Sequence, residues 1–266
     1  MKIGCSSRSF HDAFENRSLD LFAFLHLAVE LGFDGVEPLA RVFPSVSQRF
    51  LTELRETLAH LPLEISAVSV SNDFAYPDPS ERRCQCEDIT LWTFVCRDLG
   101  VRVLRTFTGD LAEGIDERQA KSWVYECYES VLPAAERAGV TLAVENHSRV
   151  LGSPGELVEL VMHFGSDCLQ LCPDPRNFLQ DSPLPDEPGA SAYASLAEVA
   201  RFAVHSRLEV LDGDFAGGGG IDLARVLDIY RRACYDGYLS LEYLGDGDAR
   251  EALKRGIAYL RTLLGG

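Results

Sequence analysis

The chain has 266 residues, of which 46% are hydrophobic, and its formal net charge is -16 at pH 7. Nucleic acids and anionic membranes require a cationic surface on the protein that binds them, so this charge argues against both as partners. The sequence has no apolar run long enough to span a membrane, and its first residues lack the layout of a secretory signal. We therefore expect a cytoplasmic globular protein with a large core.

The eight cysteines are scattered through segments that have the patterns of strands and helices. There is no Cys-x-x-Cys pair, and the closest two are Cys84 and Cys86. This spacing favours reduced cysteines packed in a core over a disulfide framework or a zinc site.

Helical and strand patterns alternate along the whole chain. Apolar residues at helical spacing, preceded by capping residues and often followed by glycine, predict helices at 21–31, 47–60, 81–99, 117–138, 154–163, 223–233 and 249–264. Short apolar or β-branched runs predict strands at 2–5, 63–70, 101–107, 140–144, 168–172 and 202–207, and two more that end at Glu37 and Glu242. Eight strands that alternate with helices, without a linker, predict one α/β domain over residues 1–266, a single (β/α)8 TIM barrel.

The run that follows Gly139 indicates where chemistry is expected. Residues 140–144 are all apolar or β-branched, which is typical of a parallel strand buried on both faces. Directly after them come Glu145, Asn146 and His147, three polar groups for which a buried strand has no structural use. Parallel α/β folds place ligand-binding residues at this end of their strands, so we expect a functional site there.

Other predicted strands also end in charged residues. In a closed barrel the carboxyl ends of all strands meet at one mouth, so these side chains would become neighbours. The residues concerned are Glu37, Arg105, Glu145, His147, Asp174, His205, Arg207 and Glu242.

Three carboxylates and one imidazole in this set lie on four successive predicted strands. Such a group predicts an oxygen-rich site for one divalent metal ion, Mn²⁺, Mg²⁺, Co²⁺ or Zn²⁺, because crowded carboxylates without a cation repel one another. Its members are Glu145, Asp174, His205 and Glu242. Taken singly, a glutamate at a strand end is more often solvated or in a salt bridge, and His205 alone would equally suit a hydrogen-bonded core position.

Two arginines have two interpretations each. Arg207 lies two residues after His205 and so points to the same side of its strand. With Arg105 it can clamp a phosphate or carboxylate of a substrate, or with equal weight it can pair with Glu209 or another carboxylate of the protein. Glycines 217–220 suit a flexible loop better than a phosphate cradle, and the proline-rich segment 180–194 suits a lid or a surface excursion.

These motifs, in this order, resemble the xylose isomerase-like TIM-barrel family of sugar phosphate isomerases and epimerases. The resemblance covers essentially the whole chain. It rests on the runs Glu145-Asn146-His147, Asp174-Pro175-Arg176-Asn177, Val204-His205, Gly218-Gly219-Gly220-Ile221-Asp222 and Tyr235-Asp236-Gly237-Tyr238-Leu239-Ser240-Leu241-Glu242.

The resemblance implies a metal-dependent sugar isomerase or epimerase whose partner is a small carbohydrate. Glu145 and Glu242 would be catalytic, flanking the substrate on opposite faces and moving a proton next to a carbonyl, while a divalent metal stabilises an enediolate. The implied metal ligands are Glu145, Asp174, His205 and Glu242, and we assign substrate contacts to Glu37, Arg105, His147, Asn177 and Arg207. Many epimerases of the family have a histidine where this chain has Asn177, and an amide holds a hydroxyl but does not titrate near neutral pH.

Three alternative functions stay open. A lyase of the same fold, which dehydrates a cyclic polyol or keto acid such as an inosose, would need the same metal and base. An AP endonuclease-like activity is disfavoured by the negative charge and by the few histidines at strand ends. A non-catalytic sugar-binding barrel would keep the fold without a stoichiometric metal. The sequence also leaves open whether the chain forms a homo-oligomer.

Overall fold

The computed structural model describes residues 1–180, 190–211 and 221–265. Its strands are β1 (Lys2–Ser6), β2 (Gly35–Glu37), β3 (Glu64–Ile65), β4 (Val68–Ser69), β5 (Val103–Thr106), β6 (Thr141–Glu145), β7 (Leu169–Cys172), β8 (Ser206–Val210) and β9 (Tyr238–Tyr243). Its α-helices are α1 (His11–Glu15), α2 (Leu21–Leu31), α3 (Gln48–Ala59), α4 (Pro79–Leu99), α5 (Glu117–Ala138), α6 (Pro154–Phe164), α7 (Pro175–Gln180), α8 (Ala190–Val199), α9 (Leu223–Arg232) and α10 (Ala249–Leu264). The glycine run 217–220 and residues 181–189 of the segment 180–194, predicted as a lid or surface excursion, lie outside the described residues, and residues 190–194 of that segment begin α8.

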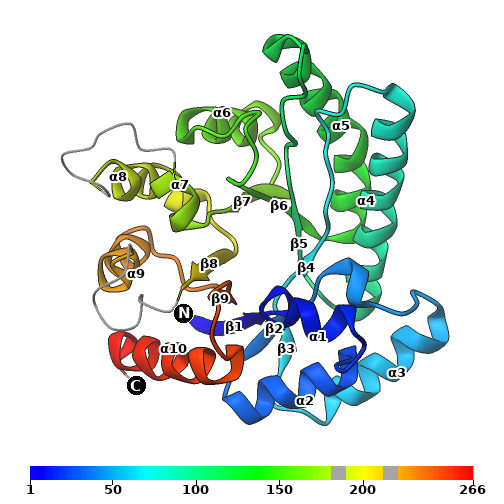
Figure 1. Cartoon of the computed structure of the whole chain (residues 1–266). Coiled ribbons are helices and arrows are strands. Elements are labelled where there is room, and N and C mark those ends of the chain that lie inside the picture. Colours follow the sequence, from blue (N-terminus) through cyan, green and yellow to red (C-terminus); the bar gives the residue numbers. More distant parts are fainter. Residues whose placement is uncertain (181–189, 212–220, 266) are drawn as a thin grey trace.

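The strands are parallel and form a ring with the helices outside it (Figure 1). One sheet has the order β3-β2-β1-β9-β8 and the other β4-β5-β6-β7. Parallel bridges join the two sheets at Leu39 with Ser69 and at Leu171 with Ala203. The Val204 amide also donates to the Leu171 carbonyl, at 3.0 Å. Because β3 and β4 together make one strand of the ring, the architecture is the predicted eight-stranded α/β barrel.

Helix ends follow the local sequence signals. At the start of α6 the Ser153 hydroxyl accepts a hydrogen bond from the Glu156 amide, while the Glu156 carboxylate accepts one from the Ser153 amide. At the end of α5, Gly139 has a φ of 66°, in the left-handed region that glycine adopts at little cost. These short turns fix where each following strand begins, and therefore which residues reach the mouth of the barrel.

Two predicted strands differ from the observed ones. β8 begins at Ser206 rather than at residue 202, because residues Ala200–Phe202 form a turn of 3-10 helix (η3). The apolar alternation instead continues to Leu208 and Val210, which are both buried. The predicted strand 63–70 is interrupted between β3 and β4, where the Ser66 hydroxyl donates to the Val36 carbonyl of β2 at 3.0 Å.

The core occupies the inside of the barrel and the space between strands and helices. The strand residues Leu104, Leu142, Leu169 and Leu239 are each fully buried. None of the helices in the described ranges combines the length and apolar character that crossing a lipid bilayer requires.

The loop after β5 yields a test of the mouth's packing. Gly109 has a φ of 110°, and a Cβ there would lie 2.0 Å from Asp73 Oδ1 and 2.7 Å from the Ala75 amide nitrogen. We expect Gly109→Ala to lower the free energy of unfolding by about 2–5 kcal/mol, since it combines backbone strain with a clash. Gly114 has a φ of 77°, and a Cβ added there would meet nothing within 4 Å, so Gly114→Ala is the matched control. This control should cost only about 1 kcal/mol. Equal losses in urea unfolding of the two variants would contradict this packing.

Candidate functional site

Four carboxylates lie buried at the mouth end of the barrel. Glu37 ends β2, Glu145 ends β6, and Glu242 lies near the end of β9. Asp174 closely follows β7. Each of the four has at most 1% of its surface exposed. Carboxylates that lose their hydration destabilise a protein unless cations or N–H donors replace the water, so their partners decide what this site can do.

Arg105 compensates two of these carboxylates. It rises from β5 and is itself only 2% exposed. Its Nε donates to Glu37 Oε1 at 2.6 Å, and its Nη1 forms an ion pair with Glu145 Oε2. Burial alone would raise the pKa of Glu37, but Arg105 and the hydrogen bond to His205 hold that pKa well below its usual range.

Arg207 compensates the other side of the site. Its Nη1 lies 3.1 Å from Glu145 Oε1, and its Nη2 forms an ion pair with Glu242 Oε1. Its Nε lies 3.9 Å from Asp174 Oδ2. One planar cation therefore contacts carboxylates from three separate parts of the ring. Of the two interpretations of Arg207, the structure shows the pairing with protein carboxylates, although Glu209 itself faces Arg176.

Asp174 is held by main-chain donors in addition to Arg207. Its Oδ1 accepts from the Arg176 amide at 2.9 Å and its Oδ2 from the Glu209 amide at 3.2 Å. Burial raises the pKa of Asp174 to about 6, and Arg207 and these amides offset only part of that rise.

Two asparagines extend strand pairing into the mouth, a role that the sequence analysis did not assign. The Asn146 side chain donates to the Asp174 carbonyl at 3.0 Å and accepts from the Asp174 amide at 2.7 Å. Asn72 does the same to Phe107, at 2.7 and 2.9 Å. A side-chain amide carries the same donor and acceptor as a peptide group, so it continues the ladder beyond the strand. The sequence signal is an asparagine shortly after an apolar strand.

His205 occupies a different part of the barrel from Glu242. Ser206 lies opposite Leu239, and Glu209 lies opposite Glu242. His205 therefore enters the barrel about four residues, or about 13 Å of strand, before the level of Glu242. Its Nε2 is 3.1 Å from Glu37 Oε2, so the ring contacts the carboxylate that the predicted metal site does not include.

The remaining predicted residues, and one that the sequence analysis did not single out, complete the network. Asn177 Nδ2 donates to Glu145 Oε1 at 3.3 Å. The His147 side chain, 57% exposed, has its Nδ1 4.0 Å from the same oxygen, and burial together with the two nearby arginines lowers the pKa of His147. The Ser6 hydroxyl, at the end of β1, donates to Glu242 Oε2 at 2.9 Å.

All nine predicted site residues thus belong to one connected network. They are Glu37, Arg105, Glu145, His147, Asp174, Asn177, His205, Arg207 and Glu242.

The four predicted metal ligands do not fit a single ion in this arrangement. Arg207 lies between Glu145, Asp174 and Glu242, and His205 is bonded to Glu37. Over the described ranges, no three His, Cys, Asp or Glu side chains are grouped so that they could hold a metal ion.

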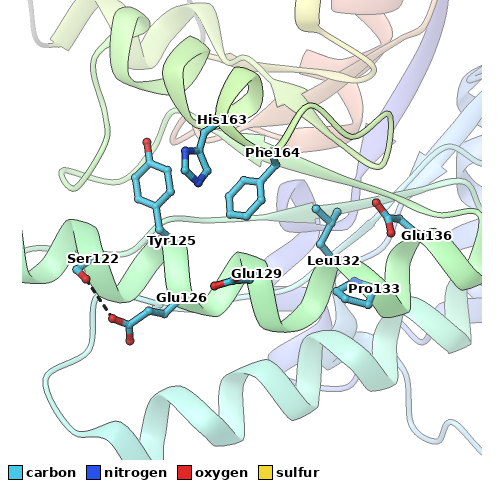
Figure 2. A pocket seen from close by; sticks show the side chains of 9 residues that line it. All are labelled: Ser122, Tyr125, Glu126, Glu129, Leu132, Pro133, Glu136, His163 and Phe164. Atoms are coloured by element: carbon cyan, nitrogen blue, oxygen red, sulfur yellow. Dashed lines mark hydrogen bonds between the residues drawn. The ribbon is translucent and has the colours of Figure 1, made fainter.

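Two surface hollows are lined by residues other than the nine predicted site residues. One of about 370 Å³ is lined by residues 8–13 and by residues that follow Glu242, from Tyr243 to Ala249. Another, of about 360 Å³, lies between α5 and α6 on the outside of the barrel, and none of the predicted site residues lines it (Figure 2).

Comparisons with known proteins agree with this architecture. Residues 25–263 match the family described as xylose isomerase-like TIM barrel. D-psicose 3-epimerase from Clostridium cellulolyticum H10, solved with D-tagatose, superimposes with a TM-score of 0.80 at 16% identity, over 99% of both chains. A D-tagatose 3-epimerase-like protein gives 0.78 at 20% identity, over 100% of this chain and 99% of that one. The IolI protein, solved with a zinc atom, gives 0.79 at 18% identity, over 99% and 98%. No curated protein matches the sequence.

Fold and site together define an α/β barrel with a buried acidic network at its mouth. The chain belongs to the xylose isomerase-like TIM-barrel family.

Removal of Arg105 tests whether the network is electrostatically balanced. We expect Arg105→Met to lower the free energy of unfolding by about 3–5 kcal/mol, because Glu37 and Glu145 would each lose a buried cation. Arg102, exposed just before the same strand, provides the matched control, and Arg102→Met should stay within about 0.5 kcal/mol of the wild type. A small loss for Arg105→Met in chemical denaturation would show that the carboxylates do not depend on it.

Proposed function

We propose that this protein is an isomerase or epimerase of a small carbohydrate, a sugar, sugar phosphate or keto-polyol, that moves a proton at the carbon next to a carbonyl. The observation that supports it most is the placement of Glu145 and Glu242, two buried carboxylates from β6 and β9 that contact different nitrogens of one guanidinium. Proton transfer through an enediolate requires an acid–base group on each face of the substrate carbon and a positive charge near the enediolate oxygens, and these three side chains would supply them.

The proposed proton path uses the two glutamates in turn. Glu145 takes the proton from the carbon, the C–H electron pair moves into an enediolate, and the acid form of Glu242 returns a proton to the opposite face. Glu37, Arg105, His147, Asn177 and Arg207 are proposed to contact the substrate's hydroxyl or phosphate groups. Because the predicted metal ligands do not fit one ion here, this path contains no step on a metal.

The solved relatives support the substrate class. They include structures described as D-psicose 3-epimerase, D-tagatose 3-epimerase-like protein, L-ribulose 3-epimerase and 3-keto-D-glucoside 4-epimerase. Each shares 20% identity or less with this chain, so the particular sugar is a matter for a substrate screen rather than for analogy.

A non-catalytic sugar-binding barrel is the second candidate. The observation that favours it is that Glu145 and Glu242 are at most 1% exposed and already engaged in ion pairs. Such pairs also hold a protein together without any reaction.

A deuterium-exchange screen tests the proposal. Ketohexoses, ketopentoses, their phosphates and inososes are incubated with the enzyme in D2O, and incorporation of deuterium next to the carbonyl is followed by NMR. We expect Glu145→Gln and Glu242→Gln each to lower the rate by about 1,000-fold or more, because an amide cannot take up the proton. Glu129→Gln, an exposed position on α5, is the control and should keep full activity.

The same screen separates the alternatives. A product with a new double bond, seen by ultraviolet absorbance, would mean a lyase. Undiminished exchange in both glutamine variants, with melting curves that show them folded, would remove these residues from the mechanism. Saturable sugar binding without any exchange would favour the non-catalytic barrel.

A further inference from the structure

The Arg207 guanidinium lies where three of the predicted metal ligands converge. Its terminal nitrogens pair with Glu145 and Glu242, and its Nε, which is buried without a hydrogen-bond partner, lies 3.9 Å from Asp174 Oδ2. The side chain is 8% exposed, so the contacts form in a largely dehydrated space. A divalent ion would have to bind oxygens about 2.0–2.6 Å away in this same space.

All but one of the carboxylate oxygens around Arg207 already accept hydrogen bonds or pair with Arg105. Glu145 Oε2 pairs with Arg105, and its Oε1 accepts from Arg207. Glu242 Oε2 accepts from Ser6, whereas its Oε1 forms an ion pair with Arg207 Nη2 but is buried without a hydrogen-bond partner. Asp174, as described above, uses both oxygens to accept main-chain N–H groups. A metal ion would need to displace several of these donors together.

Arg207 occupies the space that a metal ion would need, and it cannot itself bind the ion. A guanidinium has donors only and keeps its charge at all physiological pH values, so it repels a metal ion and never coordinates one. The single histidine of the predicted ligand set, His205, lies deeper in the barrel and contacts Glu37.

We propose that the Arg207 guanidinium takes the place of a divalent metal ion, so that this protein has no metal requirement at the site formed by Glu145, Asp174 and Glu242. The metal-binding half of the inference stands on this geometry alone. Its catalytic half, in which Arg207 supplies the positive charge that stabilises the enediolate, rests on the function proposed above.

The register of the strands makes Arg207 fit this task. Arg207 lies opposite Ser240, and Arg105 lies opposite Ala143. Each arginine therefore starts two residues deeper in the barrel than the glutamate of the neighbouring strand that it meets, Glu242 or Glu145. A long side chain that rises from this depth brings its charged end level with the carboxylates, whereas a histidine at position 207 would leave room above it for an ion.

Cobalt binding tests the inference. Chelator-treated wild-type protein, Arg207→His and the double variant Arg207→His with Asp174→Asn are titrated with Co²⁺, and binding is followed by calorimetry and by the visible absorption of the ion. We expect no stoichiometric Co²⁺ binding to the wild type. Arg207→His should bind one Co²⁺ per chain, with an affinity at least about 100-fold higher than any residual binding to the wild type, and the double variant should lose this site. Arg201→His, an exposed position in η3, controls for the addition of a histidine.

Each outcome decides the inference. A stoichiometric Co²⁺ site in the wild type that Glu145→Gln abolishes would overturn it. Folded Arg207→His that binds no ion would overturn it as well, because Arg207 would then not be what excludes the metal. If Arg207→His fails to fold, Arg207→Ala is measured in its place and interpreted in the same way. These titrations need no substrate, so their result is separate from the fate of the proposed isomerase activity, which is checked by deuterium exchange in the presence of EDTA.

Discussion

Compensation of buried carboxylates is the constraint on which this structure depends. Glu37, Glu145, Asp174 and Glu242 face the inside of the barrel almost without exposure, and the desolvation of four such groups costs far more than a domain's net stability unless each is paired. Two guanidiniums do most of the pairing by sharing Glu145 between them. Hydroxyl, main-chain and amide N–H groups supply the rest, and burial leaves Asp174 with a pKa of about 6. The charged side chains at the mouth therefore form one connected network, in which a change of charge at one residue alters the electrostatic environment of its neighbours.

The barrel makes that unit possible by placing long side chains below short ones. Parallel register brings Arg105 and Arg207 in two residues beneath their glutamate partners, so the charged ends converge at the mouth. Asn72 and Asn146 lock neighbouring strand ends together where the regular ladder stops. Solved structures described as sugar epimerases share this fold, and barrels of this kind carry different chemistries at the ends of the same strands.

The sequence predicted seven of the helices, but not α1, α7 or α8, and it predicted the residues at the mouth but not which partner each of them contacts. Caps such as Ser153 and terminal glycines such as Gly139 are local signals, so helix bounds agreed closely with the structure. Period-two alternation placed His205 and Arg207 on the inner face correctly, since it reports on the face of a strand. The alternation does not show how far along the barrel axis each residue lies. β8 spans Ser206–Val210 instead of 202–207, so His205 and Arg207 both lie deeper than predicted: His205 contacts Glu37, and only the longer Arg207 side chain reaches the predicted metal ligands. That depth depends on pairing with distant strands, which no local pattern encodes.

The identity of the cation between Glu145 and Glu242 decides how this mouth works. The most direct measurement is anomalous diffraction at the cobalt absorption edge from crystals of the wild-type protein soaked in Co²⁺. If Arg207 is that cation, we expect its guanidinium density between the two carboxylates and no anomalous peak within about 3 Å of them, the range of metal–oxygen contacts. An anomalous peak bonded to Glu145, Asp174 and Glu242, with Arg207 turned away, would contradict this assignment.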